Sequence, residues 1–341
     1  MANYKTNDIS CDFDFTLQGK NFGAAQLANA NAELGNRIPI VTIANGSGPT
    51  ILLCAGNHGE EDEGQLILRR LIHEIDPKDI QGRIIFMPAL NYPAVRACTR
   101  TSPLDNGNLN RSFSGDGAGP TPGIARFIVD VLLPLADAGM DFHSAAYAAK
   151  FVDTTFLCTC ADAALYQRSL ELADAFQAPY MYAVNNIGNT RNFDSAAHAQ
   201  NVAFVSAELG GGGMNLDTIR IGYEGVKNVL SHLELIEAPE REIKAVNTVY
   251  LDAGNRSAGV QAPYEGLFEA RFEVGDEVEA GQVAGILHSL DEVDRQPKEL
   301  FFTESGVVFV MSLSARVFYG TSICKTAKVV THDKILALAN K

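Results

Sequence analysis

The sequence contains no run of about 18 apolar residues, the length that a membrane-spanning helix needs. Its first 14 residues carry no basic flank before an apolar segment, so we expect no secretory signal peptide. Positive charge is also scarce, because 27 Lys and Arg face 41 Asp and Glu and the formal net charge is −14. This balance opposes attraction to phosphate backbones. We therefore expect neither a membrane nor a nucleic acid as a partner.

Cysteine is sparse too, with six residues scattered through 341 positions. In a chain without a secretory signal, reduced thiols in the cytoplasm are a simpler interpretation than disulfides, and we predict cysteines in or near the core. Cys158 and Cys160 form a C-x-C motif, which without a second cysteine pair gives only weak support for zinc. The composition indicates a cytoplasmic globular protein with room for two domains.

Apolar runs that predict strands alternate with segments of helical periodicity through the first two thirds of the chain. The predicted strands are residues 39–44, 50–55, 83–87, 140–142, 155–160 and 202–207, and the predicted helices are residues 65–75, 123–135, 161–176 and 218–235. Residues 45–48 (NGSG) join the first two strands as a hairpin or as a strand-turn-strand connection. The alternation predicts a largely parallel sheet covered by helices.

The texture of the sequence changes near residues 237–239. Short runs separated by turns such as Val274-Gly275-Asp276 follow, without a convincing helix until the extreme end. We predict two domains: an α/β domain at residues 1–240 and a small all-β domain at residues 241–341.

The segment GNHGEE, residues 56–61, follows the predicted strand 50–55. Functional groups of α/β sheets gather beyond the carboxyl ends of strands, and glycines permit a tight bend beside a ligand. His58 and Glu61 can direct an imidazole and a carboxylate at one point, which makes them a candidate zinc ligand pair. The spacing alone is common, and an acidic helix start favoured by the helix dipole explains the segment equally well.

A catalytic zinc needs a third protein ligand, and His143 is the natural candidate because it follows the predicted strand 140–142. Asp141 could orient an imidazole, although strand alternation could equally point it elsewhere. The other histidines are better interpreted as solvated or packed side chains; they are His73, His198, His232, His288 and His332.

Glu208 ends another apolar strand and is followed by Leu209 and four glycines. A lone glutamate at a strand end is usually a solvated edge residue. Four consecutive glycines favour another interpretation, because such a run usually marks a close approach of the backbone. Glu208 could accept a proton from a zinc-bound water and later deliver it to a leaving amine.

The loop RTSPLDNGNLNRSF, residues 100–113, contains two arginines and several turn formers. Arginine binds carboxylates in a bidentate way, so this loop could form a local anion site in an acidic protein. A solvated loop with scattered charge is the equally good alternative.

The four segments GNHGEE, RTSPLDNGNLNRSF, DFHS and AELGGGG occur in an order that resembles the succinylglutamate desuccinylase and aspartoacylase family, relatives of the zinc carboxypeptidases. Four motifs in order are far more specific than any one. The resemblance covers roughly residues 50–235. The longer wordings NYPAVRACTRTSPLDNGNLNRSF and SAELGGGG look closest to bacterial deacylases of ectoine degradation, which remove acetyl from N-acetyl-diaminobutyrate. The implied fold is a zinc-carboxypeptidase-like mixed, mostly parallel sheet covered by helices.

Carried over by position, the resemblance implies His58, Glu61 and His143 as the ligands of one Zn²⁺ per chain and Glu208 as the general base. The implied reaction is hydrolysis of the amide bond of a small N-acyl amino acid by a metal-bound water. Iron, cobalt or manganese could occupy the same ligand set.

The resemblance also implies roles for residues outside the ligand set. Arg100 would polarise the scissile carbonyl and stabilise its oxyanion, and Asn110 and Arg111 would bind the substrate carboxylate. Arg191 and Tyr264 are assigned to the later arginine and the C-terminal tyrosine of aspartoacylases.

The chain departs from its relatives at Asn108 and Ser114, where an acidic residue and a proline are usual, and at Ala145-Ala146, where close relatives tend to have two glycines. These changes affect the acyl and side-chain pockets. The substrate therefore stays open between an N-acetyl-diaminobutyrate-like and an N-acyl-Asp/Glu-like compound.

Residues 266–325 resemble the biotinyl/lipoyl-like β fold, but no lysine stands in a suitable hairpin. A structural lid or a contact in a homo-oligomer is the better interpretation of this segment.

Two other functions stay open. A metallocarboxypeptidase acting on short peptides could use the same groups, and a carrier or scaffold could retain a vestigial metal site.

Overall fold

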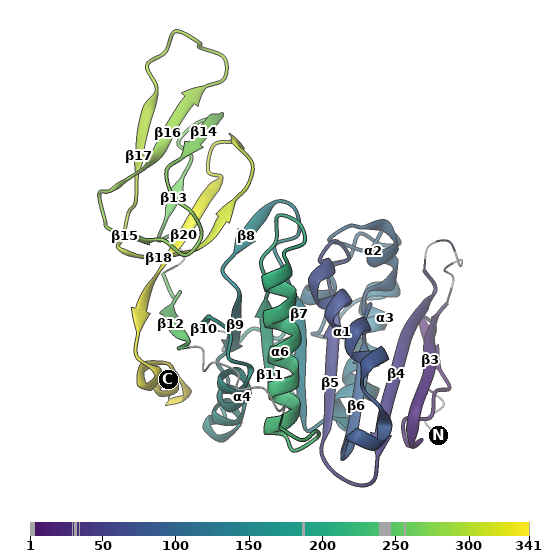
Figure 1. Ribbon diagram of the computed structural model, residues 1–341. Helices are drawn as coiled ribbons and strands as arrows, with labels where there is room; N and C mark the ends of the chain where they lie inside the picture. The colour runs from purple at the N-terminus through teal and green to yellow at the C-terminus, as the bar shows by residue number, and fades with distance from the viewer. Residues whose placement is uncertain are drawn as a thin grey trace.

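The structure, a computed structural model, describes residues 4–28, 30, 33, 35–185, 188–238, 247–255 and 257–340. Its centre is a large mixed sheet with helices on both faces (Figure 1). The neighbouring strands of this sheet are, in order, β1 (Tyr4–Lys5), β2 (Ile9–Cys11), β3 (Gly19–Leu27), β4 (Arg37–Asn45), β6 (Gly82–Met87), β5 (Thr50–Ala55), β7 (Ala138–His143), β11 (Ala203–Glu208), β9 (Thr154–Cys158), β10 (Tyr180–Val184), β12 (Val249–Asp252), β20 (Ser322–Val330), β18 (Gly306–Ser312) and β15 (Glu277–Val278).

The direction of the strands changes across the sheet. Strands β6, β5, β7 and β11 run parallel, as do β9, β10 and β12, whereas β9 is antiparallel to β11. The strands from β1 to β4, and the pair of β4 with β6, are antiparallel. The predicted mixed sheet is therefore present, but its parallel part is confined to the centre.

The central strands are buried along their whole length, which explains their continuous apolar sequences. Every residue of β5 (TILLCA) and of β7 (AGMDFH) is buried. The predicted connection between β4 and β5 is a strand-turn-strand and not a hairpin, because β6 lies between these two strands and pairs with both.

Two groups of helices cover the sheet. Helices α1 (Asp62–Glu74), α4 (Ala163–Phe176) and α6 (Leu216–His232) contribute apolar side chains to one core, and α3 (Pro120–Phe127) and α5 (Phe193–Ala199) contribute to another. The predicted helix 123–135 is present in parts, because α3 continues as a π turn at Ile128–Leu132 and a 3-10 turn at Leu133–Leu135. A short helix, α2 (Tyr92–Ala97), follows β6.

The C-terminal part is rich in strands and ends in the short helix α7 (His332–Leu336), as the sequence predicts. A second, antiparallel sheet has the order β17 (Lys298–Phe301), β16 (Val283–Ser289), β14 (Gly266–Ala270) and β19 (Arg316–Val317). Two further strands join the large sheet: β13 (Val260–Gln261) pairs with β20, and β8 (Ala149–Phe151) pairs with β18. The predicted boundary at residues 240/241 lies outside the described residues.

All six cysteines are free thiols. Four are buried and Cys160 is partly buried, in agreement with the prediction. The prediction is wrong for Cys98, which is exposed because it forms the left-handed cap at the end of α2. Among the described residues, no helix is long and apolar enough to cross a membrane.

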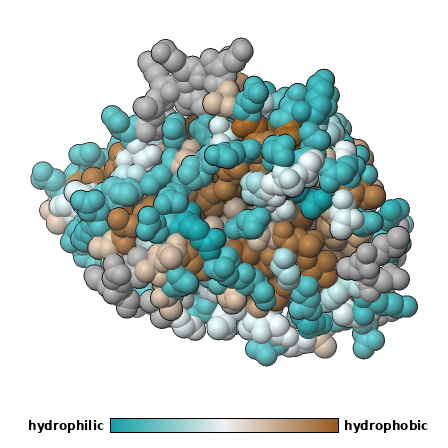
Figure 2. All heavy atoms as spheres, turned by 90° about the horizontal axis from the view of Figure 1, so that it is seen from below, coloured by the Kyte–Doolittle hydropathy of each residue, from teal (hydrophilic) through white to brown (hydrophobic). Residues whose placement is uncertain are grey.

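The lower face of the molecule lies at the amino ends of the central strands and is hollowed by a cavity of about 950 Å³. Figure 2 views this face, where apolar atoms lie between polar ones. Residues from the end of α1, such as Glu74, and from the end of α6, such as Lys227 and Ser231, line this cavity. The functional residues predicted from the motifs lie at the opposite, carboxyl edge of the sheet.

Candidate active site

The carboxyl ends of β5, β7 and β11 meet at one edge of the sheet. The strand register places Ala55 of β5 beside Phe142 of β7, and His143 of β7 beside Glu208 of β11. Gly56 adopts a positive φ of 72° directly after β5, which turns the chain toward α1. Strand pairing therefore gathers residues that are far apart in the sequence.

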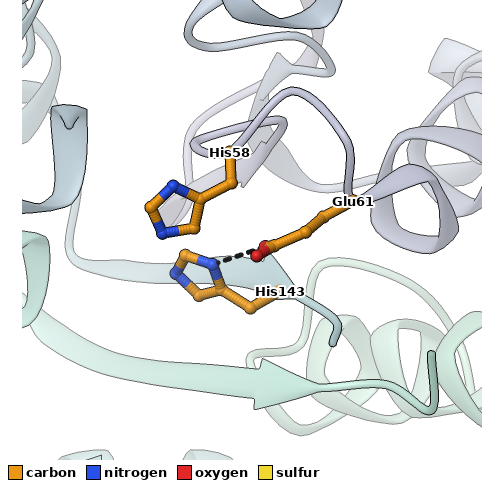
Figure 3. Close-up of side chains that lie close together, drawn as sticks. All are labelled: His58, Glu61 and His143. Carbon is orange, nitrogen blue, oxygen red and sulfur yellow. Dashed lines mark hydrogen bonds and ion pairs between the residues drawn. The ribbon is translucent and has the colours of Figure 1, made fainter. Parts of the chain in front are cut away.

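Three of these residues form a compact cluster of possible metal ligands (Figure 3). One donor atom from each of His58, Glu61 and His143 lies within 4.8 Å of the other two, and all three residues are buried. No other such group of three exists among the described residues. Glu61 is the residue before α1, so the acidic helix start and the ligand pair are both present in this segment.

Each imidazole has one nitrogen engaged outside the cluster. The Nδ1 atom of His58 lies 3.2 Å from the backbone oxygen of Arg100, and Nε2 of His143 lies 2.9 Å from Oδ2 of Asp141. Ligating histidines commonly donate their second nitrogen to a carbonyl or a carboxylate in this way. Two imidazoles and a carboxylate are the ligands of many catalytic zinc sites, so the residues fit a metal ion.

The electrostatics of the cluster also favour a cation. Burial lowers the pKa of His58 to about 2, with His143 and Arg100 adding to the effect, so this imidazole is neutral. Burial lowers the pKa of His143 as well, but the carboxylates of Asp141 and Glu61 outweigh it and raise the pKa well above the usual value. Nδ1 of His143 lies 2.9 Å from Oε2 of Glu61.

Glu208 lies at the end of β11, beside His143. Its Oε2 atom is buried and has no hydrogen-bond partner among the described residues. Burial raises the pKa of Glu208 to about 8; His143 lowers it, and Glu61 raises it further. A carboxyl group with a pKa near neutrality can both accept and release a proton.

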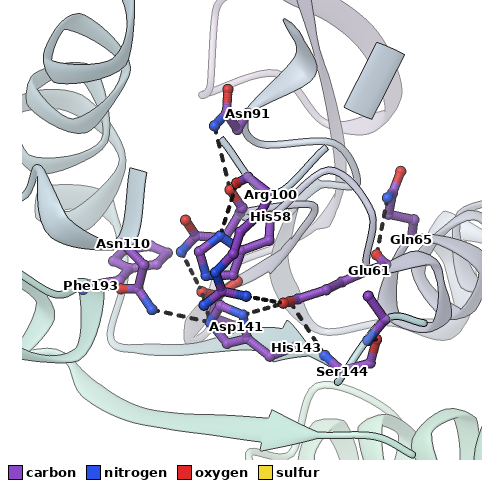
Figure 4. A network of polar contacts seen from close by, with 12 residues as sticks. His58, Glu61, Gln65, Asn91, Arg100, Asn110, Asp141, His143, Ser144 and Phe193 are labelled. Atoms are coloured by element: carbon purple, nitrogen blue, oxygen red, sulfur yellow. Dashed lines mark hydrogen bonds and ion pairs between the residues drawn. The ribbon is translucent and has the colours of Figure 1, made fainter. Parts of the chain in front are cut away.

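Arg100 reaches the cluster from the loop after α2. Its Nη1 atom lies 3.2 Å from Oε1 of Glu61, and about half of its side chain is exposed. The guanidinium thus borders both the ligands and the solvent (Figure 4). A preorganised cation at this place can stabilise negative charge that develops on a bound carbonyl.

Asn110 and two arginines lie on the other side of His143. The amide Nδ2 of Asn110 is 3.4 Å from Nε2 of His143, and its Oδ1 accepts a hydrogen bond from the backbone N–H of Phe193 (Figure 4). Arg191 donates from Nε to the backbone oxygen of Arg111. Burial lowers the pKa of Arg111, and the charges of Arg100 and Arg191 lower it further, which shows that the three guanidinium groups share one region.

Tyr264 is not brought to this cluster by any contact of the described residues. Its hydroxyl donates to the backbone oxygen of Leu287, and Arg295 stacks on its ring at 4.4 Å. These contacts belong to the C-terminal sheet.

Two buried contacts at the site were not predicted from the sequence. Asn57 donates from Nδ2 to Asp141, and Ser144 donates its backbone N–H to Glu61. The only sequence signal was their position beside His58 and His143.

The glycine run after Glu208 lies against two other loops. The backbone N–H of Gly212 donates to Ala146, and a Cβ atom at Gly211 would lie 2.7 Å from the backbone oxygen of Ala149. Leu313 of the C-terminal part lies on Gly212 and donates its own backbone N–H to Ala148. The predicted close approach of the backbone is therefore present.

A smaller cavity of about 190 Å³ lies beside the ligand cluster. Its lining contains three acidic and no basic residues: Glu60, Asp62, Glu63, Leu66, Ala146, Tyr147, Gly213, Met214 and Ile219. Ser144 joins this cavity to the cluster, because its backbone N–H bonds Glu61 and its hydroxyl bonds the carboxylate of Glu63.

A mixed α/β sheet with a buried His-Glu-His cluster, a buried glutamate oxygen and an arginine at its carboxyl edge defines a hydrolase-like class of protein with a candidate metal centre. Residues 47–233 match the family model described as the succinylglutamate desuccinylase/aspartoacylase catalytic domain. The chain belongs to the succinylglutamate desuccinylase/aspartoacylase family. It is accordingly an amidohydrolase, as the motifs predict.

Individual relatives agree with this family. The chain is 36% identical, over 96% of both lengths, to the N-α-acetyl-L-2,4-diaminobutyric acid deacetylase of Halomonas elongata. Among solved structures it is similar to a succinylglutamate desuccinylase/aspartoacylase of Rhodobacter sphaeroides, with 35% identity, a TM-score of 0.86, and 95% and 100% of the two chains covered. It is also similar to a product-bound ectoine utilization protein of Ruegeria pomeroyi, with 31% identity, a TM-score of 0.87 and the same coverage.

Proposed function

We propose that this protein is a zinc-dependent deacylase that hydrolyses an N-acetyl-diaminobutyrate-like compound. The observation that carries the metal-dependent reaction is the His58, Glu61 and His143 cluster beside Glu208. The 36% identity to the deacetylase of Halomonas elongata supports the acyl group and the amino acid.

A zinc ion held by His58, Glu61 and His143 would supply Lewis acidity toward the amide carbonyl and the attacking water. Glu208 takes the proton of this water and delivers it to the leaving amine. Arg100 stabilises the negative charge that develops on the carbonyl oxygen.

The same site has a binding region for the substrate carboxylate. Asn110 is oriented by Phe193 and presents its amide beside His143, while Arg111 lies near the charges of Arg100 and Arg191. Arginine and amide donors match the geometry of a carboxylate. We assign Asn110, Arg111 and Arg191 to this role. Tyr264 stays a further candidate, although its contacts within this chain lie in the C-terminal part.

The acidic cavity supports a cationic side chain on the substrate. Glu60, Asp62 and Glu63 line it without a basic neighbour, and Glu63 is 6% exposed. A buried carboxylate is stabilised by an opposite charge and destabilised by a like one. The ammonium group of N-acetyl-diaminobutyrate would be accepted there, and the carboxylate of an N-acyl aspartate or glutamate would be repelled.

We further propose a division of the chain at residues 240/241, with a lipoyl-like C-terminal part that serves as a structural lid or an oligomer contact. The contact of Leu313 with the glycine run supports the role of a lid. We also propose a cytoplasmic location, where the six free thiols would stay reduced.

Metal analysis and a substrate panel test the function. We expect one zinc per chain and hydrolysis of N-acetyl-diaminobutyrate in preference to N-acetylaspartate, N-succinylglutamate and dipeptides. Glu208→Gln should keep the zinc and lose turnover by about 10²–10⁴-fold, because it removes the base.

Each alternative has its own result in the same panel. Preferential cleavage of the dipeptides would indicate a metallocarboxypeptidase. No hydrolysis of any compound by the wild-type protein would favour a vestigial site. An unchanged activity in Glu208→Gln would remove Glu208 from the mechanism, and active enzyme without metal would contradict the zinc proposal.

A further inference from the structure

Asn57 is the residue between Gly56 and the ligand His58, and its side chain is completely buried. Its Nδ2 atom donates a hydrogen bond of 2.8 Å to Oδ2 of Asp141 on the neighbouring strand β7. The same Oδ2 atom lies 2.9 Å from Nε2 of His143. One carboxylate oxygen therefore receives donors from the loop of one ligand and from the ring of another.

The position of the Asp141 carboxylate depends on these two donors. Its other oxygen, Oδ1, is buried and has no hydrogen-bond partner among the described residues. Without the amide of Asn57, only the imidazole of His143 would hold the carboxylate. Asp141 could then not fix the ring of His143, because His143 would be its only partner.

The surroundings of His143 decide which of its nitrogens carries a proton toward Asp141. The amide Nδ2 of Asn110 lies 3.4 Å from the same Nε2 atom but is itself a donor, because its oxygen accepts from Phe193. The proton on Nε2 consequently points to Asp141, and Nδ1 faces Glu61 and the candidate metal position.

The carbonyl oxygen of the Asn57 side chain makes no hydrogen bond among the described residues. This Oδ1 atom is buried and unpaired within the described part of the chain, and an unpaired buried polar atom is destabilising. Asn91 reaches only the backbone oxygen of Asn57, at 3.5 Å. The donor bond to Asp141 is thus the one strong contact of the Asn57 side chain.

We propose that Asn57 is a positioning residue for the metal centre. By holding Asp141, it fixes the tautomer and the ring orientation of His143, and it ties the loop of His58 to the strand of His143. The inference rests on the proposed metal function, and it adds a third residue to the chain of contacts that ends at the metal ligand.

The test compares Asn57→Leu, which keeps the branched shape of the side chain but removes the donor, with Asn91→Leu as a matched control that introduces the same increase in volume. Asn91 is equally buried and lies in the same network, but it does not contact Asp141. Zn²⁺ dissociation constants are measured on the metal-free proteins by competition with a chelating dye, and visible absorption spectra are recorded after loading with Co²⁺.

We expect Asn57→Leu to weaken Zn²⁺ binding by about 10–100-fold, the usual effect of removing an outer partner of a ligating histidine. The Co²⁺ spectrum should change as well, and both properties should stay near wild type in Asn91→Leu. A merely structural role would lower the unfolding temperature of both variants and leave the spectrum unchanged.

Unchanged Zn²⁺ affinity and spectrum in Asn57→Leu would overturn the inference. If this variant does not fold, Asn57→Ser is measured instead, because its shorter side chain also fails to reach Asp141 and should show the same loss. Wild-type protein that binds no metal at all would contradict the proposed function, which separates that failure from a failure of the Asn57 proposal alone.

Discussion

Glu63 is a nearly buried carboxylate whose partner is the hydroxyl of Ser144. If it binds the ammonium group of the substrate, Glu63→Gln removes a charged hydrogen bond that contributes about 1.5–3 kcal/mol. We expect KM for N-acetyl-diaminobutyrate to rise by about tenfold or more, with little change in kcat. Steady-state kinetics measure both constants. Glu171→Gln on the exposed surface of α4 is the control, and an unchanged KM in Glu63→Gln would place the ammonium elsewhere.

His198 on α5 is a partly buried group outside the site. Burial lowers its pKa to about 4, and its Nε2 atom has no hydrogen-bond partner in the described part of the chain. The unfolded chain has a histidine pKa of about 6.5, so it binds more protons than the folded chain between these two values. The contribution of His198 to stability is complete above about pH 6.5 and is lost as the pH falls toward 4.

His198→Gln should remove this pH dependence. Urea unfolding at pH 7 and pH 4.5 gives the free energy of unfolding, and we expect wild type to lose up to about 3 kcal/mol more than the variant on acidification. Equal losses in the two proteins would show that the imidazole is already protonated in the folded state.

At the level of single residues, the sequence predicted the members of the site and not their mutual contacts. His58, His143 and Glu208 could be found because each lies at or just after the end of an apolar strand. The bond from Asn57 to Asp141 could not, because it joins positions 84 apart and depends on the pairing of β5 with β7. The role of Tyr264 stays a prediction, because its contacts within this chain lie in the C-terminal part.

Among the elements, the glycine loop after β11 packs closely against two neighbouring loops. Gly211 and Gly213 both have a positive φ, near 107° and 111°. A Cβ atom at Gly211 would meet the backbone oxygen of Ala149 at 2.7 Å, whereas nothing lies within 4 Å of a Cβ atom at Gly213. Substitutions at these two glycines therefore distinguish the cost of backbone strain alone from the cost of strain together with steric overlap.

We expect Gly213→Ala to destabilise the fold by about 1–3 kcal/mol through its strained φ alone. Gly211→Ala should destabilise it by more, because a backbone oxygen cannot move away as a flexible side chain could. Urea unfolding curves of the two variants measure the difference. Equal destabilisation would mean that the loops around Gly211 shift at little cost.

Elements with a buried apolar face were predicted better from the sequence than half-buried elements. Strands β5, β7 and β11 and helices α1, α4 and α6 were placed within about three residues, because apolar residues define them. Strand β3 (GKNFGAAQL) was not predicted, since its small and polar residues are mostly half-buried and show no alternation. The hairpin alternative for β4 and β5 failed because their shared neighbour, β6, comes later in the chain.

The molecule as a whole does not separate cleanly at the predicted boundary. Strand β12 pairs with β10, and β18 pairs with β8, so the large sheet crosses from the first part of the chain to the second. One apolar core also contains residues of both parts: Val152, Tyr182, Leu251, Val307, Phe309 and Ala327. The sequence indicated the change from helix-strand alternation to short strands, but not that one sheet spans both parts. Pairing between strands that are far apart in the sequence leaves no local pattern.

A chain that ends at Ala238 should therefore lose stability and solubility. It would expose the edge of β10 together with Val152 and Tyr182, which would lose the other residues of the shared core. Unpaired apolar edges promote aggregation. Expression, light scattering and thermal unfolding compare this fragment with the full chain. A soluble fragment with a cooperative transition would support two independent folding units.

The complete set of candidate metal ligands forms only when the chain folds. Glu61 and His143 are separated by 82 positions, so an unfolded chain offers a metal ion only the weak pair of His58 and Glu61. A metal ion that recognises the folded state alone stabilises that state and is absent from early folding. Such an ion would slow unfolding and leave the rate of folding almost unchanged. The metal would thus govern the lifetime of the folded chain and not its formation.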